Sequence, residues 1–339
     1  MFNPDHYTVG WICALAIEFV AAQAMLDESH GIPDYVSTSD DNSYALGRIG
    51  SHNIVIAILP LGKYGTVSAA LVARDMTHSF PNVRVGLMVG IGGGAPSLQN
   101  DVRLGDVVVG SSVFQFDIGN VIQGRSFEFT NTYEPPPPML RTAVGALYNQ
   151  HRMNGHRIQS DIRAAFERYP RIVQEFGKPR EGSDYLFRSD VVHSSQCADE
   201  KTCHVNRSKL VCRAHRCPKT DDPFIHHGVI ASSDILMKDA SIRDDLAKRK
   251  RVICFEMEAA GLLHHFPCLV IRGVCDYSDS HKNKVWQGYA AMTAAAYAKD
   301  LLRNISPTTV AKERRIIDVL CRGTLFSTAA KAARVNSSC

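Results

Sequence analysis

The chain has 339 residues, of which 45% are hydrophobic and 21% are charged, and its formal net charge is +4. This composition is that of an ordinary globular protein with room for a large core, and it excludes a disordered or disulfide-dependent chain. The small positive charge does not by itself indicate a nucleic-acid partner, and it fits an anionic small substrate only weakly.

The N-terminal segment and the cysteines indicate the cellular compartment of the protein. The start, Met-Phe-Asn-Pro-Asp-His-Tyr, lacks the basic and then apolar pattern of a signal peptide. No apolar run reaches the roughly 18 residues that a membrane helix needs. The ten cysteines do not follow the spacing of a disulfide framework. We therefore expect a cytoplasmic protein with reduced thiols and no membrane partner.

The first third of the chain alternates apolar strands with helices. A strand is predicted over residues 7–16, and a helix follows it from Glu18. The next predicted elements are a hairpin (44–49 and 53–59), a helix opened by the turn at 62–65 (TVSAALVARDM), a buried strand (85–89) that runs into a glycine turn (90–94), and a strand after Leu104-Gly105-Asp106 (VVVGSSV).

The middle of the chain is less regular. Residues 135–138 are four prolines, which predict a stiff extended piece. A helical region is expected over about 139–177. Residues 178–224 are polar and rich in Cys, Arg and Asp, without clear periodicity. We interpret them as a long excursion from the domain.

Regular structure returns in the last third. Strands are predicted at 228–231, 251–255 and 268–274, with a helix beginning at Glu256 and a long alanine-rich helix over 287–304. The weakly amphipathic segment after Ile305 predicts a tail or linker helix. The expected organisation is therefore one catalytic domain, residues 1–304, followed by a C-terminal tail, residues 305–339.

Strands separated by helices predict an α/β protein, here a three-layer αβα sandwich with a central mixed sheet. In such sheets, ligands bind at the carboxyl ends of the strands. Four predicted strands end near Glu18, the glycines at 90–94, the Glu256/Glu258 pair and Asp276. This coincidence predicts an active site there.

Asp276 ends the apolar strand in the segment RGVCD. A carboxyl group buried at such a place can hold a proton at neutral pH and donate it to N7 of a departing purine. Asp is also a favoured helix N-cap, and taken alone that structural role is the better explanation.

Glu258 lies in the segment FEMEAAG, at a junction between a strand and a helix. Acids stabilise helix N-termini, which is the structural explanation of this pair. The functional explanation is a ribose clamp, in which Glu258 accepts hydrogen bonds from the vicinal hydroxyls and Met257 packs on the sugar.

Gly92 and Gly93 allow close backbone approach to a ligand, although GIGGGAP matches neither GxGxxG nor a P-loop. Glu18, which follows a strand, could orient a water molecule. An acid that stabilises the first turn of a helix is an equally good explanation when Glu18 is viewed alone.

These segments together resemble the nucleoside phosphorylase-I superfamily, which includes purine nucleoside phosphorylase, uridine phosphorylase and the methylthioadenosine/S-adenosylhomocysteine nucleosidases. CFEMEAAG and RGVCDYSD look like its signature, and ALAIE, LPLGKYGTVSAA, VGIGGG, GDVVVG and GVIASSDILMKD occur in the same order. The resemblance covers residues 7–304 apart from 135–224. It extends to the version found in fungal proteins as an N-terminal effector module of NLR-like chains.

The resemblance implies a role for each matching position. Asp276 falls on the general acid, Glu18 on the glutamate that activates water, and Glu258 with Met257 on the ribose-binding pair. Leu236 and Met237 resemble residues that contact the base, and Lys63 resembles a lysine beside the site. The resemblance also implies a homo-oligomer in which a neighbouring subunit completes the pocket, and it implies no cofactor.

Two positions indicate whether phosphate or water is the nucleophile. The phosphorylases of this superfamily bind phosphate with an Arg in the strand before the glycine turn and with a hydroxyl residue after the first glycine. Here these positions are Met88 and Ile91, and Glu18 occupies the place of their phosphate loop. The resemblance therefore favours hydrolysis over phosphorolysis, with phosphorolysis as the alternative.

The substrate implied by the resemblance is an adenine nucleoside or nucleotide, ATP included. A nucleotide needs cations near its 5′ group, and the candidates are Lys63, Arg125, Lys238, Lys282 and Lys284. Solvated surface charge is the simpler explanation of each.

Other constellations give weaker signals. Cys197, Cys203, Cys212 and Cys217, with His204 and His215, have the spacing C-x5-C-x8-C-x4-C, which lacks the paired CxxC of a zinc finger. We expect a reduced loop and no metal. The basic residues at 207–219 have no interleaved aromatics, so no nucleic-acid partner is expected. A catalytically weak nucleoside-sensing or interaction module is the alternative of another class.

Overall fold

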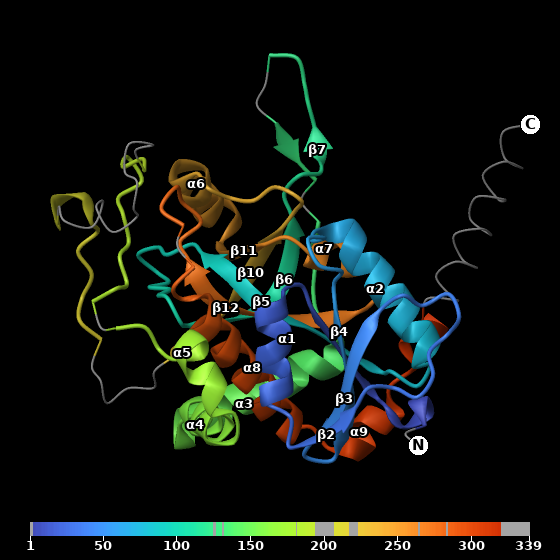
Figure 1. The fold of residues 1–339 in the computed structure, drawn as a ribbon. Helices are drawn as coiled ribbons and strands as arrows, with labels where there is room; N and C mark the ends of the chain where they lie inside the picture. The colour runs from blue at the N-terminus through green and yellow to red at the C-terminus, as the bar shows by residue number, and fades with distance from the viewer. Residues whose placement is uncertain are drawn as a thin grey trace, which may run out of the picture.

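The computed structural model describes residues 3–124, 127–130, 132–180, 182–193, 207–216, 223–263, 265–282 and 284–319 (Figure 1). The strands are β1 (Val9–Cys13), β2 (Glu28–Gly31), β3 (Ser43–Ile49), β4 (His52–Ile58), β5 (Val85–Gly94), β6 (Val107–Gln115), β7 (Gly119–Asn120), β8 (Glu128–Phe129), β9 (Tyr133–Glu134), β10 (Ile225–Ser232), β11 (Val252–Glu256) and β12 (Cys268–Asp276). The helices of four residues or more are α1 (Ala16–Ala24), α2 (Thr66–Ser79), α3 (Pro138–Asn154), α4 (Ile158–Arg168), α5 (Val173–Phe176), α6 (Ala240–Lys250), α7 (Ala259–Leu262), α8 (Gln287–Arg303) and α9 (Pro307–Lys312).

A mixed sheet forms the middle layer. Its strands run in the order β11-β10-β6-β12-β5-β1-β4-β3-β2, and β9 pairs with β6. The strands of the central β12-β5-β1-β4 group run parallel to one another, whereas β3 is antiparallel to β4 and β6 is antiparallel to β12. The end of β5 also pairs with β11, so that the sheet curls back on itself around this end.

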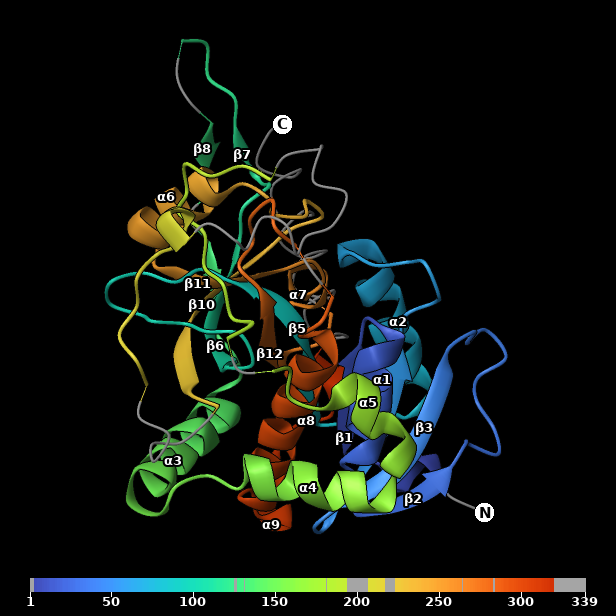
Figure 2. The ribbon, with the colours of Figure 1, turned by 60° about the vertical axis from the view of Figure 1, so that its left-hand side comes forward.

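Helices cover both faces of the sheet because successive strand residues point to opposite sides. Trp11, Leu87 and Ile271 belong to a core cluster shared with α1 and α8. Their neighbours Ile12, Met88 and Val270 belong to a second cluster shared with α2 and α7. Figure 2 shows α1, α5 and α8 gathered on one side of the sheet. The predicted three-layer α/β fold with a mixed sheet is therefore confirmed.

The structure differs from the sequence-based expectation at the glycines. The predicted turn at 90–94 is wrong, because these residues continue β5 to Gly94. A Cβ atom on Gly92 would lie 2.7 Å from the Cys254 sulfur and 2.9 Å from the Phe255 carbonyl oxygen. Gly92 is therefore a glycine because β11 packs closely against it, and its Cα does not face an open ligand site.

Two helix boundaries also differ. The helix expected from Glu256 begins at Ala259 and is only four residues long, because Glu256 still belongs to β11. The proline run does not stay extended throughout, since Pro138 is the first residue of α3. Proline fits there because the first helical residue needs no N–H partner.

The described parts of the excursion pack against the domain, which their polar composition did not predict. Arg216 binds Asp106 at the start of β6 through two hydrogen bonds of 2.7 and 2.8 Å. Asp106 also accepts from His226 Nε2 at 2.9 Å. These contacts satisfy a carboxylate that is only 1% exposed and hold its pKa low despite its burial.

The beginning of the predicted tail also contacts the domain. Val310 on α9 and Ile316 are buried, and the Ile316 N–H donates to the Val83 carbonyl oxygen at 2.8 Å. None of the described helices combines the length and hydropathy needed to cross a membrane.

Candidate active site

The predicted site residues come from the ends of β1, β5, β11 and β12, which lie next to one another. Within the β5–β12 pair, Gly90 is opposite Arg272 and Gly93 is opposite Asp276. On the other edge of β5, Gly93 is opposite Phe255 of β11. The structure thereby brings Glu18, Glu258 and Asp276 to one end of the sheet, from segments far apart in the chain.

Glu18 is the third residue of α1 and is 3% exposed. Its Oε2 accepts the N–H groups of Ala14 and Leu15 at 2.7 and 2.9 Å, and its Oε1 accepts the Ile91 N–H at 2.8 Å. Burial raises the pKa of Glu18, although Arg272 and these three hydrogen bonds act in the opposite direction. A carboxylate has about four acceptor positions, so one position remains on Oε1.

Arg272 lies in the middle of β12 and is fully buried. Its Nη2 donates to Glu256 and lies 3.4 Å from Glu258 Oε2. Within the described residues, Nε and Nη1 of Arg272 have no hydrogen-bond partner. A Cβ atom on Gly90 would lie 2.5 Å from Nη1 and would also collide with Glu18 Oε1. A spare donor and an oxygen with one spare acceptor position thus lie together over Gly90.

Glu258 is 6% exposed and is held only loosely. Its Oε1 is 3.4 Å from the Gly65 N–H, and its contact with Arg272 is equally long. Burial raises the pKa of Glu258 to about 7; Arg272 lowers it, and the neighbouring Glu256 and Glu18 raise it further. Glu256 accepts more hydrogen bonds than Glu258, since it also accepts the Ala259 N–H. Glu258 is therefore the carboxyl group best able to exchange its partners for a ligand.

Asp276 is 8% exposed and ends β12. Its Oδ1 accepts the Ser278 N–H at 2.8 Å, and its Oδ2 lies 3.1 Å from the Lys282 ammonium nitrogen. A Cβ atom on Gly93 would collide with Ser278 Oγ and would lie 2.7 Å from Asp276 Oδ1, so this glycine makes room for both side chains beside β5.

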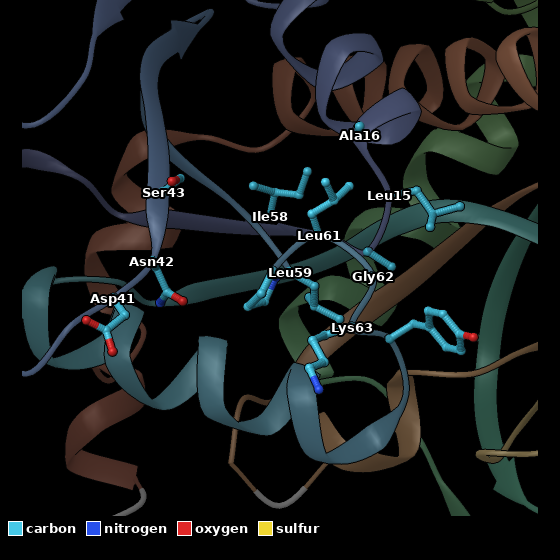
Figure 3. A pocket seen from close by; sticks show the side chains of 13 residues that line it. Leu15, Ala16, Asp41, Asn42, Ser43, Ile58, Leu59, Leu61, Gly62 and Lys63 are labelled. Carbon is cyan, nitrogen blue, oxygen red and sulfur yellow. The ribbon is translucent and has the colours of Figure 1, made fainter.

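Lys63 is exposed and lines a cavity of about 400 Å³ beside the N-terminus of α1 (Figure 3). Figure 3 shows Asp41 and Asn42 on one side of this cavity and Leu15 and Gly62 on the other. The loop that carries Lys63 continues to Gly65, which has φ +95° and contacts Glu258. The cavity therefore adjoins the Glu18–Glu258 cluster.

The remaining predicted residues differ in exposure. Leu236 is 47% exposed, whereas Met237 is buried in a third cluster with Phe116 and Phe255. Met257 is half-buried between Glu256 and Glu258. Of the predicted cations, Lys282 contacts Asp276, Lys238 and Lys284 are exposed, and Arg125 lies outside the described residues.

The predicted cysteine and histidine cluster lies mostly outside the described residues. Cys197, Cys203, Cys217 and His204 lie outside the described residues, and Cys212 is exposed with a free thiol. Within the part of the chain that the structure describes, there is no group of three His, Cys, Asp or Glu residues that could hold a metal ion.

Sequence reasoning missed Arg272 and Asp234. An arginine inside the apolar strand CLVIRGV was a usable signal, because a buried charge needs a partner. Asp234 accepts the Thr66 N–H at 2.8 Å and its hydroxyl at 2.9 Å, which fixes the start of α2. Nothing in the local sequence pairs residues 168 positions apart.

No family model matches the chain. A curated relative, described as a "Nucleotide-binding leucine-rich repeat (NLR)-like protein" from Hyaloscypha variabilis, is 43% identical over 320 residues, which cover 93% of this chain. They cover 31% of the relative, so the chain spans about a third of that protein's length.

Solved structures show the same fold. The 5′-methylthioadenosine/S-adenosyl homocysteine nucleosidase of Helicobacter pylori, in complex with a pyrrolidin-3-ol compound, is similar with a TM-score of 0.56 and 15% identity, over 88% of this chain and 99% of that one. Futalosine hydrolase of the same organism gives 0.57 and 15% over the same shares. A Neisseria meningitidis nucleosidase, in complex with methylthio-immucillin-A, gives 0.52 and 16%, again over 88% and 99%. The chain thus has the nucleosidase fold.

Proposed function

We propose that this chain hydrolyses the N-glycosidic bond of a purine nucleoside or nucleotide, with adenine as the base. One observation carries the proposal. Glu18 Oε1, which has one acceptor position left, and Arg272 Nη1, which has no partner among the described residues, lie together over Gly90. A water molecule bound between them would satisfy both groups.

The proposed mechanism divides the work among three carboxyl groups. Asp276 donates a proton to N7 of the base, so that the base leaves as a neutral species. Positive charge then develops on the ribose. The water held by Glu18 gives a proton to the Glu18 carboxylate and attacks C1′. Glu258 accepts hydrogen bonds from the ribose hydroxyls, and Met257 packs on the sugar. The Lys282 ammonium, 3.1 Å from Asp276, then pairs with the carboxylate that proton donation leaves behind.

Met88 and Ile91 support water over phosphate as the nucleophile. Met88 is fully buried in the apolar core on the α2 face of the sheet, so β5 presents no cation to an anion. The Ile91 N–H is already taken by Glu18. A phosphate dianion at this place would meet the Glu18 carboxyl group without a compensating side-chain donor from β5. Phosphorolysis is the alternative reaction.

The other predicted residues limit which substrate would fit the site. Leu236 and Met237 would contact the base, and Gly93, which lies beside the Asp276 carboxyl group, would let the backbone come close to it, whereas Gly92 faces β11. The cavity lined by Lys63 would take the 5′ side of the sugar, because it adjoins Glu258 and the start of α1. A 5′ phosphate there would be paired by the Lys63 ammonium. No cofactor takes part in this mechanism.

The relative's description favours a second candidate of another class, a nucleoside-sensing or interaction module.

We also propose that the chain forms a homo-oligomer. The β7–β8 arm projects from the body of the molecule in Figure 1. Val121 on this arm is 89% exposed and Ile118 is 48% exposed, and we expect the arm to contact a second subunit.

The proposed function is tested by incubating the protein with adenosine, inosine, AMP and ATP, each with and without phosphate, and measuring free base. Base released without phosphate supports a hydrolase, and base released only with phosphate indicates a phosphorylase. If no base is released, a binding role is favoured instead. The Asp276→Asn variant should lose the activity, because its amide cannot donate an acidic proton; a near-wild-type rate would disprove the acid assignment.

A further inference from the structure

The excursion reaches the loop that follows Asp276. Two of its described parts are residues 182–193, called the first leg, and residues 207–216, called the second leg. The legs pair at Phe187 and Leu210, with a 2.8 Å hydrogen bond from the Val211 N–H to the Leu186 carbonyl oxygen. They therefore act on the domain as one unit.

Both legs bind the side chain of Tyr277, the residue after Asp276. The Tyr277 hydroxyl donates to Asp184 Oδ1 at 2.5 Å and accepts from Arg213 Nη1 at 2.7 Å. Arg213 Nη2 and Asp184 Oδ2 close the triangle at 2.9 Å. Burial and the adjacent Asp184 raise the pKa of Tyr277, which keeps its hydroxyl neutral and able to donate. We call Asp184, Arg213 and Tyr277 the tyrosine clamp.

Further contacts hold the same loop. Arg243 on α6 donates to the Tyr277 carbonyl oxygen at 2.8 Å, and the His193 N–H donates to Ser280 Oγ at 2.9 Å. The Phe187 ring stacks on the His281 ring, with centroids 3.8 Å apart. The space enclosed between the first leg and the loop is only about 20 Å³, which is room for about one water molecule. The loop thus has little freedom to shift.

The loop in turn fixes the carboxyl group of Asp276. The Asp276 carboxyl group accepts from two residues of this loop, through the Ser278 N–H and the Lys282 ammonium, and its Oδ2 also lies 3.4 Å from the Cys275 sulfur of β12. Ser278 has φ +53°, a conformation that residues other than glycine adopt at a cost, so the surrounding contacts must maintain it. A change in the backbone at Tyr277 would therefore move the Asp276 carboxyl group.

We propose that Asp184 and Arg213 are positioning residues for Asp276, acting through Tyr277; this rests on the proposed function. Neither residue needs to touch the substrate. Arg213 and Asp184 have side chains that are 14% and 22% exposed, at the edge of the domain, so their loss should not unfold the core. Their effect should fall on the geometry of proton donation, where a displacement of about 1 Å can slow a reaction by about 100-fold.

The test uses the full chain with Arg213→Ala, Tyr277→Phe and the conservative Arg213→Lys. The first two variants should lower kcat by about 10–100-fold and leave KM within about threefold, because proton donation changes more than binding. Arg213→Lys should recover part of kcat, since it restores one donor. The matched control is Arg188→Ala, which removes an exposed ion pair with Asp190 on the first leg and should match wild type.

Amide hydrogen exchange provides a readout that does not depend on catalysis. The amides of residues 276–281 should exchange faster in Arg213→Ala and Tyr277→Phe, and at the wild-type rate in Arg188→Ala. Unchanged exchange, or unchanged kcat in folded variants of an active wild type, overturns the clamp. If the wild type releases no base while exchange changes as expected, the proposed function fails and the structural clamp stands.

Discussion

The carboxylate of Glu258 lies 3.4 Å from the guanidinium group of Arg272, and both side chains are more than nine-tenths buried. Arg272 also faces Glu256 and Glu18, so one buried cation serves three carboxyl groups. This imbalance keeps a proton near neutral pH on the cluster, because three buried negative charges around one positive charge repel each other. The cluster is therefore both a site for chemistry and a source of pH dependence.

Arg272→Met should destabilise the fold strongly. Removing the only cation of this cluster leaves buried carboxyl groups without a counter-charge, and such losses cost about 3–5 kcal/mol. Urea unfolding measures the change. The matched control is Arg48→Met, which breaks an exposed ion pair with Glu28 and should cost under about 1 kcal/mol. Equal effects of the two variants would mean that Arg272 does not balance the cluster.

Glu258 should make the stability fall as the pH rises. Its pKa in the folded protein is raised from 4.5 to about 7, so the folded state binds more protons than the unfolded state between these values. The stabilising contribution is full below about pH 4.5 and is lost as the pH rises through about 7. Urea unfolding over this range should show a smaller decline for Glu258→Gln. A decline identical to that of the wild type would contradict the raised pKa.

Gly90→Ala should reduce activity sharply. The new methyl group would meet Glu18 Oε1 and Arg272 Nη1, so the proposed water site would be displaced. A loss of about 100-fold in kcat is expected from such a shift. Gly145→Ala on α3 is the control, since its methyl group would meet no atom within 4 Å. Gly145→Ala should keep full activity and stabilise α3 by up to about 1 kcal/mol. Full activity of Gly90→Ala would exclude the space above Gly90 as the reaction site.

Lys63→Ala should distinguish nucleotides from nucleosides. If a 5′ phosphate binds in the cavity of Figure 3, this variant loses a charge-assisted contact and KM for AMP or ATP rises about tenfold. KM for adenosine should change little. Lys312→Ala on α9, which removes an equally exposed lysine, controls for net charge. Equal changes in KM for adenosine and AMP would place the 5′ group elsewhere.

Much of the fold could be predicted from local pattern. The strands β1, β3, β4, β6 and β12 and the long helix α8 follow from apolar runs and helical periodicity, which are properties of contiguous residues. The glycines at 90–94 were misread as a turn because glycine marks a turn and a close strand contact equally well. Only the packing of Cys254 and Phe255 against Gly92 decides between the two.

The site could be predicted only in part, because some of its contacts join residues that are far apart in the chain. Glu18, Glu258 and Asp276 stand at strand ends, and the topology brings them together. Asp234 acts through a partner 168 positions away, so no local pattern shows its role. The arginine within an apolar strand indicates that Arg272 needs partners, but not which ones. The tyrosine clamp depends on an excursion whose composition indicates only a polar loop. Its hydrogen bonds with Tyr277 and its ion pair with Asp106 appear once the fold is formed.

We propose above that Glu18 activates water at this site. The initial rate of adenine release from adenosine in phosphate-free buffer, for the wild type and for Glu18→Gln, tests this most directly. The wild type should release adenine at the same rate with and without phosphate, and Glu18→Gln should be slower by about 100-fold or more. Release that requires phosphate and is unaffected by Glu18→Gln would contradict it.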